Sequence, residues 1–310
     1  MTPFWLWALF AAVVVSIMAL DLGILNRNAH EVKFKEALGW CTVWILTALA
    51  FNAGVYVWYG HDKATEFLAA YVIEYALSID NIFVFIIIIT HFHVPKKYQH
   101  KVLFWGILAA IFLRAVFIGL GVVVIQRFAW VMYLFGAFLV FSGVKLALKK
   151  EGDVDPEKMG GVGLLKKIMP ITHAPDHGHF FSRIDGKLHA TTLFVALVVI
   201  NVADIVFAVD SIPAVLAISH DPFIAYTSNI FAIMGLRSLY FALAGVMDLF
   251  HYLKYGLSVI LIFVGVKMLI AEHVHMPVVA SLGVILGVLA ASIGASMVWP
   301  VKKQHTSHSH

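Results

Sequence analysis

The chain has 310 residues, of which 61% are hydrophobic and only 13% are charged, and its formal net charge is +4. Soluble domains carry roughly 25% charged residues, and a soluble fold of this length could not bury so much apolar surface. The composition therefore excludes a soluble enzyme and indicates a multi-pass membrane protein. The single cysteine, Cys41, leaves no disulfide framework and no cysteine metal cage, which argues against redox chemistry.

Apolar runs of about 20 residues, the length that crosses a bilayer, divide the chain into nine predicted transmembrane helices. The first run follows Met1-Thr2-Pro3, which lacks the basic region of a cleaved signal peptide. The predicted spans are 4–25, 37–58, 66–91, 102–125, 128–148, 190–218, 222–248, 252–271 and 277–298. The predicted fold class is thus all-α, a single membrane domain over residues 1–310.

Lysine and arginine are concentrated in alternate loops between the predicted spans. If the N-terminus lies outside, the outer loops carry little beyond Lys63 and Arg127, and nearly all other loop cations lie inside. The positive-inside rule then places the C-terminus in the cytoplasm. We expect the chain to cross the inner (plasma) membrane of a bacterium. Because topology accounts for the basic charge, no nucleic-acid partner is expected.

Spans three to five resemble spans six to eight when the chain is laid on itself. The matching segments are 74–81 with 204–211, Arg114 with Arg237, and 141–145 with 263–267. Each unit has three spans, so the second copy must enter the membrane from the opposite side. We therefore predict two inverted three-helix repeats, 66–148 and 190–271.

A polar, glycine- and proline-containing segment, 149–188, separates the two repeats. It is interpreted as a cytoplasmic linker with one short interfacial helix at 162–169, in preference to a separate domain.

Four acidic residues lie deep inside predicted spans: Glu74, Asp80, Asp204 and Asp210. An unpaired charge there costs at least ~2.5–3.5 kcal/mol, so such residues persist only with partners or with a function. The structural explanation is that Arg114 and Arg237 neutralise them as ion pairs. Four acids against two arginines still leave a surplus of two negative charges, which one divalent cation would cancel.

A proline in the second copy predicts a local opening of its helix. Pro213 follows Asp210-Ser211 and cannot donate to the carbonyl of Val209. An opened helix would present Asp210, Ser211 and the freed carbonyl together, as in midplane ion sites of transporters. Phe83 stands at the matching place in the first copy, so an opening there is inferred only by symmetry.

The candidate metal ligands are Glu74, Asp80, Asn81, Asp204, Asp210 and Ser211. Such an oxygen-rich shell suits Mg²⁺, Ca²⁺ or Mn²⁺ better than Zn²⁺ or Cu⁺. Asn201 and Asn229 are interpreted as buried bridges between helices. The roles of Asp21, Arg114, Arg237 and the histidine-containing tail stay open.

The segments 74–84, 204–214 and 227–237 resemble the TerC family of integral membrane proteins, and its Alx-type members in particular. The resemblance covers nearly the whole chain. It implies Mn²⁺ homeostasis, chiefly export, within a superfamily related to LysE exporters. On this resemblance the metal-site role falls to Asp80, Asn81, Asp204, Asp210 and Ser211. Glu74 stands where the second copy has Asp204, which leaves its role as a ligand open.

We therefore predict a transporter of divalent cations, with Mn²⁺ favoured, that is not an enzyme and has no covalent cofactor. The partners expected are the metal ion and the bilayer, and a homo-oligomer is left open. A rival function is a membrane aspartyl-type enzyme, in which Asp80 and Asp210 would share a proton about 3 Å apart. A third is a membrane partner that supplies metal to exported proteins. Metal selectivity, transport direction and proton coupling are not determined by the sequence.

Overall fold

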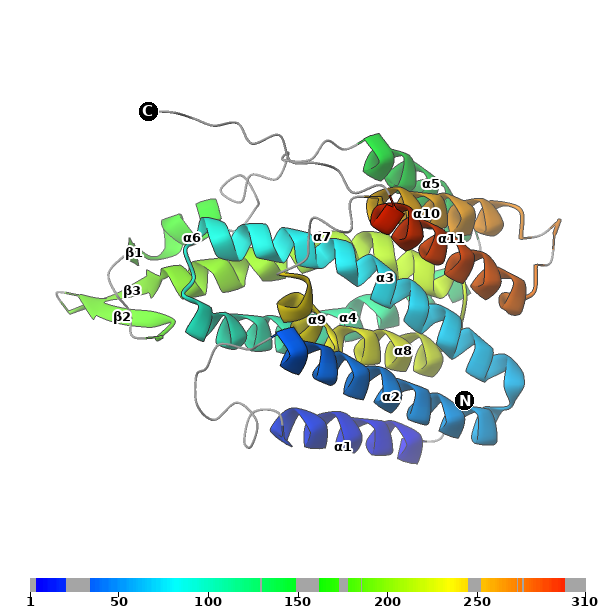
Figure 1. Cartoon of the computed structure of the whole chain (residues 1–310), viewed down its shortest axis with the longest axis horizontal. Coiled ribbons are helices and arrows are strands. Elements are labelled where there is room, and N and C mark those ends of the chain that lie inside the picture. Colours follow the sequence, from blue (N-terminus) through cyan, green and yellow to red (C-terminus); the bar gives the residue numbers. More distant parts are fainter. Residues whose placement is uncertain are drawn as a thin grey trace.

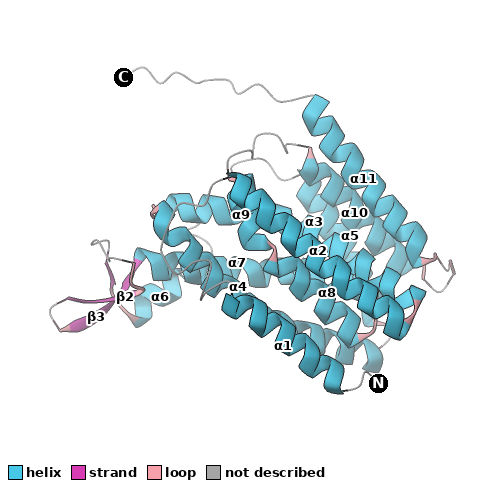
Figure 2. Cartoon of the chain, turned by 60° about the horizontal axis from the view of Figure 1, so that its bottom comes forward, coloured by secondary structure: helices cyan, strands magenta, loops and turns pink. Residues whose placement is uncertain are grey.

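A computed structural model describes residues 4–20, 34–128, 130–148, 162–172, 178–184, 186–244, 252–271, 273–274 and 276–298. These residues form a bundle of helices with one small sheet at its end (Figures 1 and 2). The predicted all-α membrane class is confirmed in this coarse form. Asp21 and the histidines of the tail lie outside the described residues.

The helices follow the predicted spans closely. They are α1 Phe4–Leu20, α2 Phe34–Tyr59, α3 His61–His91, α4 Lys96–Arg127, α5 Val131–Leu148, α6 Val162–Ile168, α7 Thr192–Leu216, α8 Pro222–Met234, α9 Leu236–Leu243, α10 Leu253–Leu269 and α11 Val278–Val298. Among the described residues, α2, α3, α4, α5, α7 and α11 are long and apolar enough to cross a membrane. The helices α1, α8, α9 and α10 are shorter than 18 residues, so the count of nine spans stays a prediction.

Two details of the predicted helices are wrong. The expected opening at Pro213 does not occur, because α7 continues through the proline to Leu216 and α3 is likewise continuous. Pro213 lies near the C-terminal end of α7, and its buried neighbours keep the backbone helical although the proline removes one hydrogen bond. The predicted seventh span is instead divided into α8 and α9 at Gly235, a residue that disfavours helix interiors.

The linker contains a sheet that the sequence did not indicate. The short helix α6 lies where a helix was predicted at 162–169, and its interfacial position stays a prediction. Strands β1 (Ile171–Thr172), β2 (Phe181–Ile184) and β3 (Lys187–Thr191) form a three-stranded sheet. The central strand β3 pairs in parallel with β1 and antiparallel with β2. Lys101 Nζ donates to the Gly178 carbonyl at 2.7 Å and so ties this end of α4 to the linker. Residues 149–161 of the predicted linker lie outside the described part of the chain.

The centre of the bundle is α3, which packs against α2, α7, α8, α9 and α11. Helix α4 lies against α7 and α8, so residues from α3, α4, α7 and α8 meet in the interior. A second tight contact joins α5 to α10. Helices α3, α4, α7 and α8 carry the buried polar residues Glu74, Arg114, Asp204 and Asn229, respectively.

Glycines allow α5 and α10 to touch through their backbones. A Cβ on Gly265 would lie 2.7 Å from the Gly136 carbonyl oxygen, and one on Gly136 would lie 2.9 Å from the Gly265 carbonyl oxygen. Further along, a Cβ on Gly143 would lie 2.9 Å from the Ser258 carbonyl oxygen. The Ser258 hydroxyl donates to the Gly143 carbonyl at 2.6 Å. Small residues at such contacts let membrane helices approach closely.

We predict that Gly265→Ala destabilises the protein by roughly 1–3 kcal/mol, because the added methyl group overpacks a backbone contact that cannot relax locally. Gly119→Ala in α4 is the matched control, since nothing lies within 4 Å of its Cβ position. Thermal melts in detergent compare the two variants with the wild type. Equal melting temperatures for Gly265→Ala and Gly119→Ala would contradict the close approach of α5 and α10.

Candidate functional site

The side chain of Arg114, in α4, lies wholly buried in the middle of the bundle. Its guanidinium donates to Glu74 of α3 and, at 3.1 Å, to Asp204 Oδ1 of α7. It also donates to Ser211 Oγ of α7 at 3.1 Å and to Asn229 Oδ1 of α8 at 3.3 Å. Four oxygen acceptors from three helices therefore converge on one cation. The predicted role of Asn229 as a bridge between helices is confirmed.

The two acids on Arg114 are themselves buried. Glu74 is 0% exposed and Asp204 is 2% exposed, and each forms an ion pair with the guanidinium. The two carboxylates come from segments that the sequence matched as repeats, one on α3 and one on α7. A buried ion pair is stable only with good geometry and further hydrogen bonds, which here come from Ser211 and Asn229.

Helical periodicity explains why Ser211 joins this cluster and Asp210 does not. Ser211 follows Asp204 by seven residues, about two helical turns, so both side chains lie on one face of α7. Asp210 is one residue earlier and is directed toward α5, where its Oδ1 accepts a hydrogen bond of 2.6 Å from Ser142 Oγ. Ser142 was not among the predicted site residues, although it lies within the matched segment 141–145.

Several buried polar atoms around Arg114 make no hydrogen bond to the described residues. They are Glu74 Oε2, Asp204 Oδ2, Ser78 Oγ, Asn81 Nδ2, Asn229 Nδ2 and Arg114 Nε. Buried polar groups are nearly always satisfied by protein, ordered water or an ion, so such a concentration is unusual. Each acid thus presents one carboxylate oxygen to Arg114 and keeps the other available as an acceptor.

The structure places the remaining predicted ligands on α3. Asn81 is buried and follows Glu74 by seven residues, on the same helix face, whereas Asp80 is half-buried. Among the described residues, no three His, Cys, Asp or Glu side chains come close enough together to hold a metal ion. Glu74, Asp204 and Ser211 are therefore brought together around Arg114, and Asp210 makes a separate contact. The ligand role of all six residues stays a prediction.

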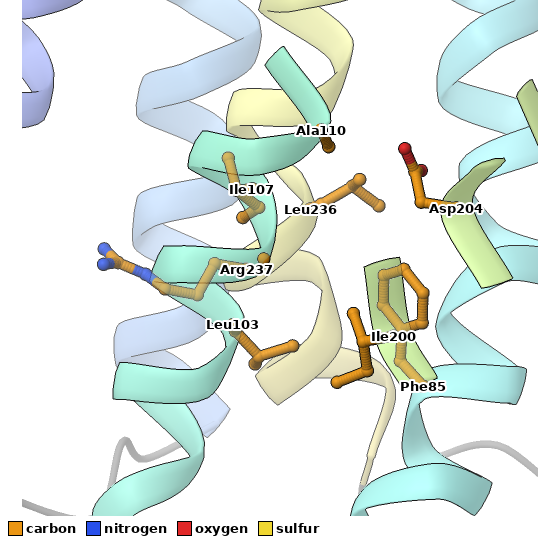
Figure 3. Close-up of a pocket in the computed structure, with 9 residues that line it drawn as sticks. Phe85, Leu103, Ile107, Ala110, Ile200, Asp204, Leu236 and Arg237 are labelled. Carbon is orange, nitrogen blue, oxygen red and sulfur yellow. The ribbon is translucent and has the colours of Figure 1, made fainter. Parts of the chain in front are cut away.

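The two arginines face different residues among the contacts seen here. Arg114 contacts two acids, whereas Arg237 Nη1 lies 3.4 Å from His100 Nε2. Figure 3 shows the Arg237 guanidinium pointing away from Asp204. Asp204 is therefore a partner of Arg114 and not of Arg237.

A narrow cavity of about 10 Å³ lies beside Asp204 (Figure 3). Its other walls are mainly apolar: Phe85, Leu103, Gly106, Ile107, Ala110, Ile200, Leu236 and Arg237. This volume is about what one water molecule needs. Its walls run along α4 from Leu103 to Ala110 and along α7 from Ile200 to Asp204.

The family model described as "Integral membrane protein TerC family" matches residues 59–305. The chain belongs to the TerC family. This TerC-family protein is 49% identical over 304 residues to "Uncharacterized membrane protein STKORF319" of Myxococcus xanthus, covering 98% of this chain and 94% of that one. It is 44% identical over 294 residues to "Putative membrane-bound redox modulator Alx" of Escherichia coli strain K12, covering 92% and 91%. No solved structure matches, and the wider relationship to LysE exporters stays a prediction.

In this TerC-family protein, we predict that Asp204→Asn and Asp210→Asn affect stability differently in the absence of metal. Asp204→Asn weakens a charge-assisted hydrogen bond to a buried guanidinium and should cost roughly 1–3 kcal/mol. Asp210→Asn keeps the oxygen that accepts from Ser142 and should cost less than about 1 kcal/mol. Thermal melts with a chelator present measure both. The reverse order would show that Asp210, and not Asp204, is the structural partner.

Proposed function

We propose that this protein transports a divalent metal cation, with Mn²⁺ favoured, across a bacterial inner membrane. The site would lie near the bilayer midplane and be built from Glu74, Asp80, Asn81, Asp204, Asp210 and Ser211. The observation that carries the proposal is the meeting of two buried carboxylates, Glu74 and Asp204, from two different helices, each with one oxygen unpartnered among the described residues. Buried acids in membrane spans mark ion pathways in many transporters.

The charges around Arg114 support a cation rather than an anion as the transported species. Glu74 and Asp204 contribute two negative charges against the single positive charge of Arg114. Asp210, adjacent to Ser211 in α7, adds a further acid nearby along the chain. A negative surplus inside a low-dielectric bundle attracts a cation strongly.

The chemistry of the ligands supports a hard divalent ion. The six proposed ligands offer carboxylate, amide and hydroxyl oxygens only, with no imidazole or thiolate among them. Oxygen ligands suit Mn²⁺, Mg²⁺ and Ca²⁺, and the manganese preference rests on the family resemblance.

The inverted repeat is part of the same proposal. If Gly143 matches Gly265, then Gly136 matches Ser258, because Gly136 precedes Gly143 by seven residues and Ser258 precedes Gly265 by seven residues. Gly136 touches Gly265 and Gly143 touches Ser258, which is the reciprocal pattern that a two-fold axis produces. This contact supports repeats 66–148 and 190–271 related by an axis in the membrane plane. Transporters with such repeats bind their ions at the repeat interface.

The structure offers less support for the enzyme. An aspartyl-type enzyme would need Asp80 and Asp210 to share a proton, whereas Asp210 accepts a hydrogen bond from Ser142 of α5. The two acids that do meet, Glu74 and Asp204, are bridged by a guanidinium. The name of the Escherichia coli relative mentions redox modulation. With Cys41 as its single cysteine, this chain cannot form an internal dithiol couple.

We predict that Asp80→Asn and Asp210→Asn each weaken Mn²⁺ binding at least about tenfold, because each change removes a charge that helps to balance the ion. The variants should still insert, since a neutral amide is cheaper in the membrane than an acid. Asp62→Asn is the matched control on α3, where the Asp62 side chain is 99% exposed. Isothermal titration with Mn²⁺, run beside thermal melts, measures the effect. Wild-type affinity in both variants would refute the proposed site.

We predict the N-terminus outside, and the linker 149–188 and the C-terminus in the cytoplasm, because the loop cations gather on that side. Reporter fusions at the two termini and within 149–188 locate each segment. A linker found outside would overturn both the orientation and the proposed entry of the second repeat from the opposite face.

A further inference from the structure

We propose, building on the transport function above, that Arg114 is a tethered counter-cation. Its guanidinium occupies the Glu74–Asp204 acid pair when no metal is bound and leaves the pair when a divalent cation binds. Metal and guanidinium would thus be alternative occupants of the same carboxylates.

The surroundings of Arg114 are those of a cation site. Its four acceptors are all oxygens, and Glu74, Asp204 and Ser211 belong to the predicted metal shell. The guanidinium keeps its positive charge under all conditions that proteins meet. It therefore supplies, from within the chain, the compensation that a metal ion would otherwise supply.

The hydrogen bonds differ from those of a permanent structural bridge. Strong arginine–carboxylate pairs are commonly bidentate, with two parallel N–H···O bonds to one carboxylate. Arg114 instead contacts one oxygen of each acid and leaves Glu74 Oε2, Asp204 Oδ2 and its own Nε without a partner among the described residues. The carboxylates are thus only half occupied and still offer oxygens through which an arriving metal ion can begin to bind.

The exchange of occupants adds two positive charges to the cluster. Glu74, Asp204 and Arg114 together carry one net negative charge, and with a divalent ion added they carry one net positive charge, which Asp210, the next acid along α7, would balance. The displaced guanidinium retains Asn229, whose oxygen is not among the predicted ligands. Arg237, its counterpart in the sequence repeat, has its Nη1 3.4 Å from His100 Nε2.

Net transport of metal and the exchange of one metal ion for another should depend differently on Arg114. A carrier that returns without metal must neutralise the negative charges of Glu74 and Asp204 during the return. In this proposal the positive charge of Arg114 does so. A carrier that exchanges one metal ion for another never passes through the metal-free state. Removal of the guanidinium should therefore stop net transport and spare exchange.

The test uses the full-length protein in liposomes with radioactive Mn²⁺. In Arg114→Gln, net flux should fall at least about tenfold while Mn²⁺–Mn²⁺ exchange stays within about threefold of the wild type. Arg127→Gln, at the exposed end of the same helix, is the matched control and should leave both unchanged. A parallel loss of exchange and net flux in a folded Arg114→Gln protein would overturn the proposal, as would unchanged net flux.

Equilibrium affinity provides a second test that does not depend on Arg114→Gln folding. Arg114→Lys keeps a positive charge but has fewer donors, so it should compete less well and tighten Mn²⁺ binding at least about threefold. If Arg114 instead organises the metal site as a structural residue, Arg114→Lys should weaken Mn²⁺ binding. Unchanged or weaker Mn²⁺ binding would overturn the proposal. A wild-type protein that neither binds nor carries Mn²⁺ or another divalent ion would instead refute the transport function itself.

Discussion

The arrangement of the interior depends on one guanidinium that cannot lose its charge and cannot reach water. Arg114 is wholly buried, and oxygens of α3, α7 and α8 surround it. Removing one partner of a buried ion pair strands the other charge, which is strongly unfavourable. The helices that carry the acids are therefore held at their present distances by electrostatics as well as by packing. This constraint also brings Glu74 and Asp204, which are 130 positions apart in the chain, to one place.

The same constraint divides the acids into two groups. Glu74 and Asp204 face the guanidinium, and Asp210, on another face of α7, accepts from Ser142 of α5. Helix α7 thus connects the Arg114 cluster to the tightly packed pair of α5 and α10.

Much of the helical architecture could be predicted because long apolar runs have few alternatives in a membrane. The nine predicted segments all contain helices, and the burial of Glu74 and Asp204 was expected from their position in those segments. The sheet in 171–191 could not be predicted, because its strands are only 2, 4 and 5 residues long and too short to show a strand periodicity.

The site was predicted less completely than the fold. Sequence identifies which acids lie in spans, but the partner of each acid depends on how helices rotate and pack. The match of Arg114 with Arg237 suggested equivalent roles, whereas the structure directs one guanidinium to the acids and the other toward His100. Pro213 suggested a broken helix, but tertiary contacts in α7 outweigh one lost hydrogen bond. Such outcomes depend on contacts across the bundle, which a single sequence does not specify.

If the buried acids serve the passage of a divalent cation, as we propose, the purified wild-type protein should carry such ions into liposomes. Metal flux is compared across Mn²⁺, Mg²⁺, Ca²⁺, Zn²⁺ and Co²⁺ with and without a pH gradient. We expect saturable flux of at least one hard divalent ion, Mn²⁺ foremost, above that of protein-free liposomes. Flux equal to that of protein-free liposomes for every metal, from protein shown to be folded, would refute transport by this protein.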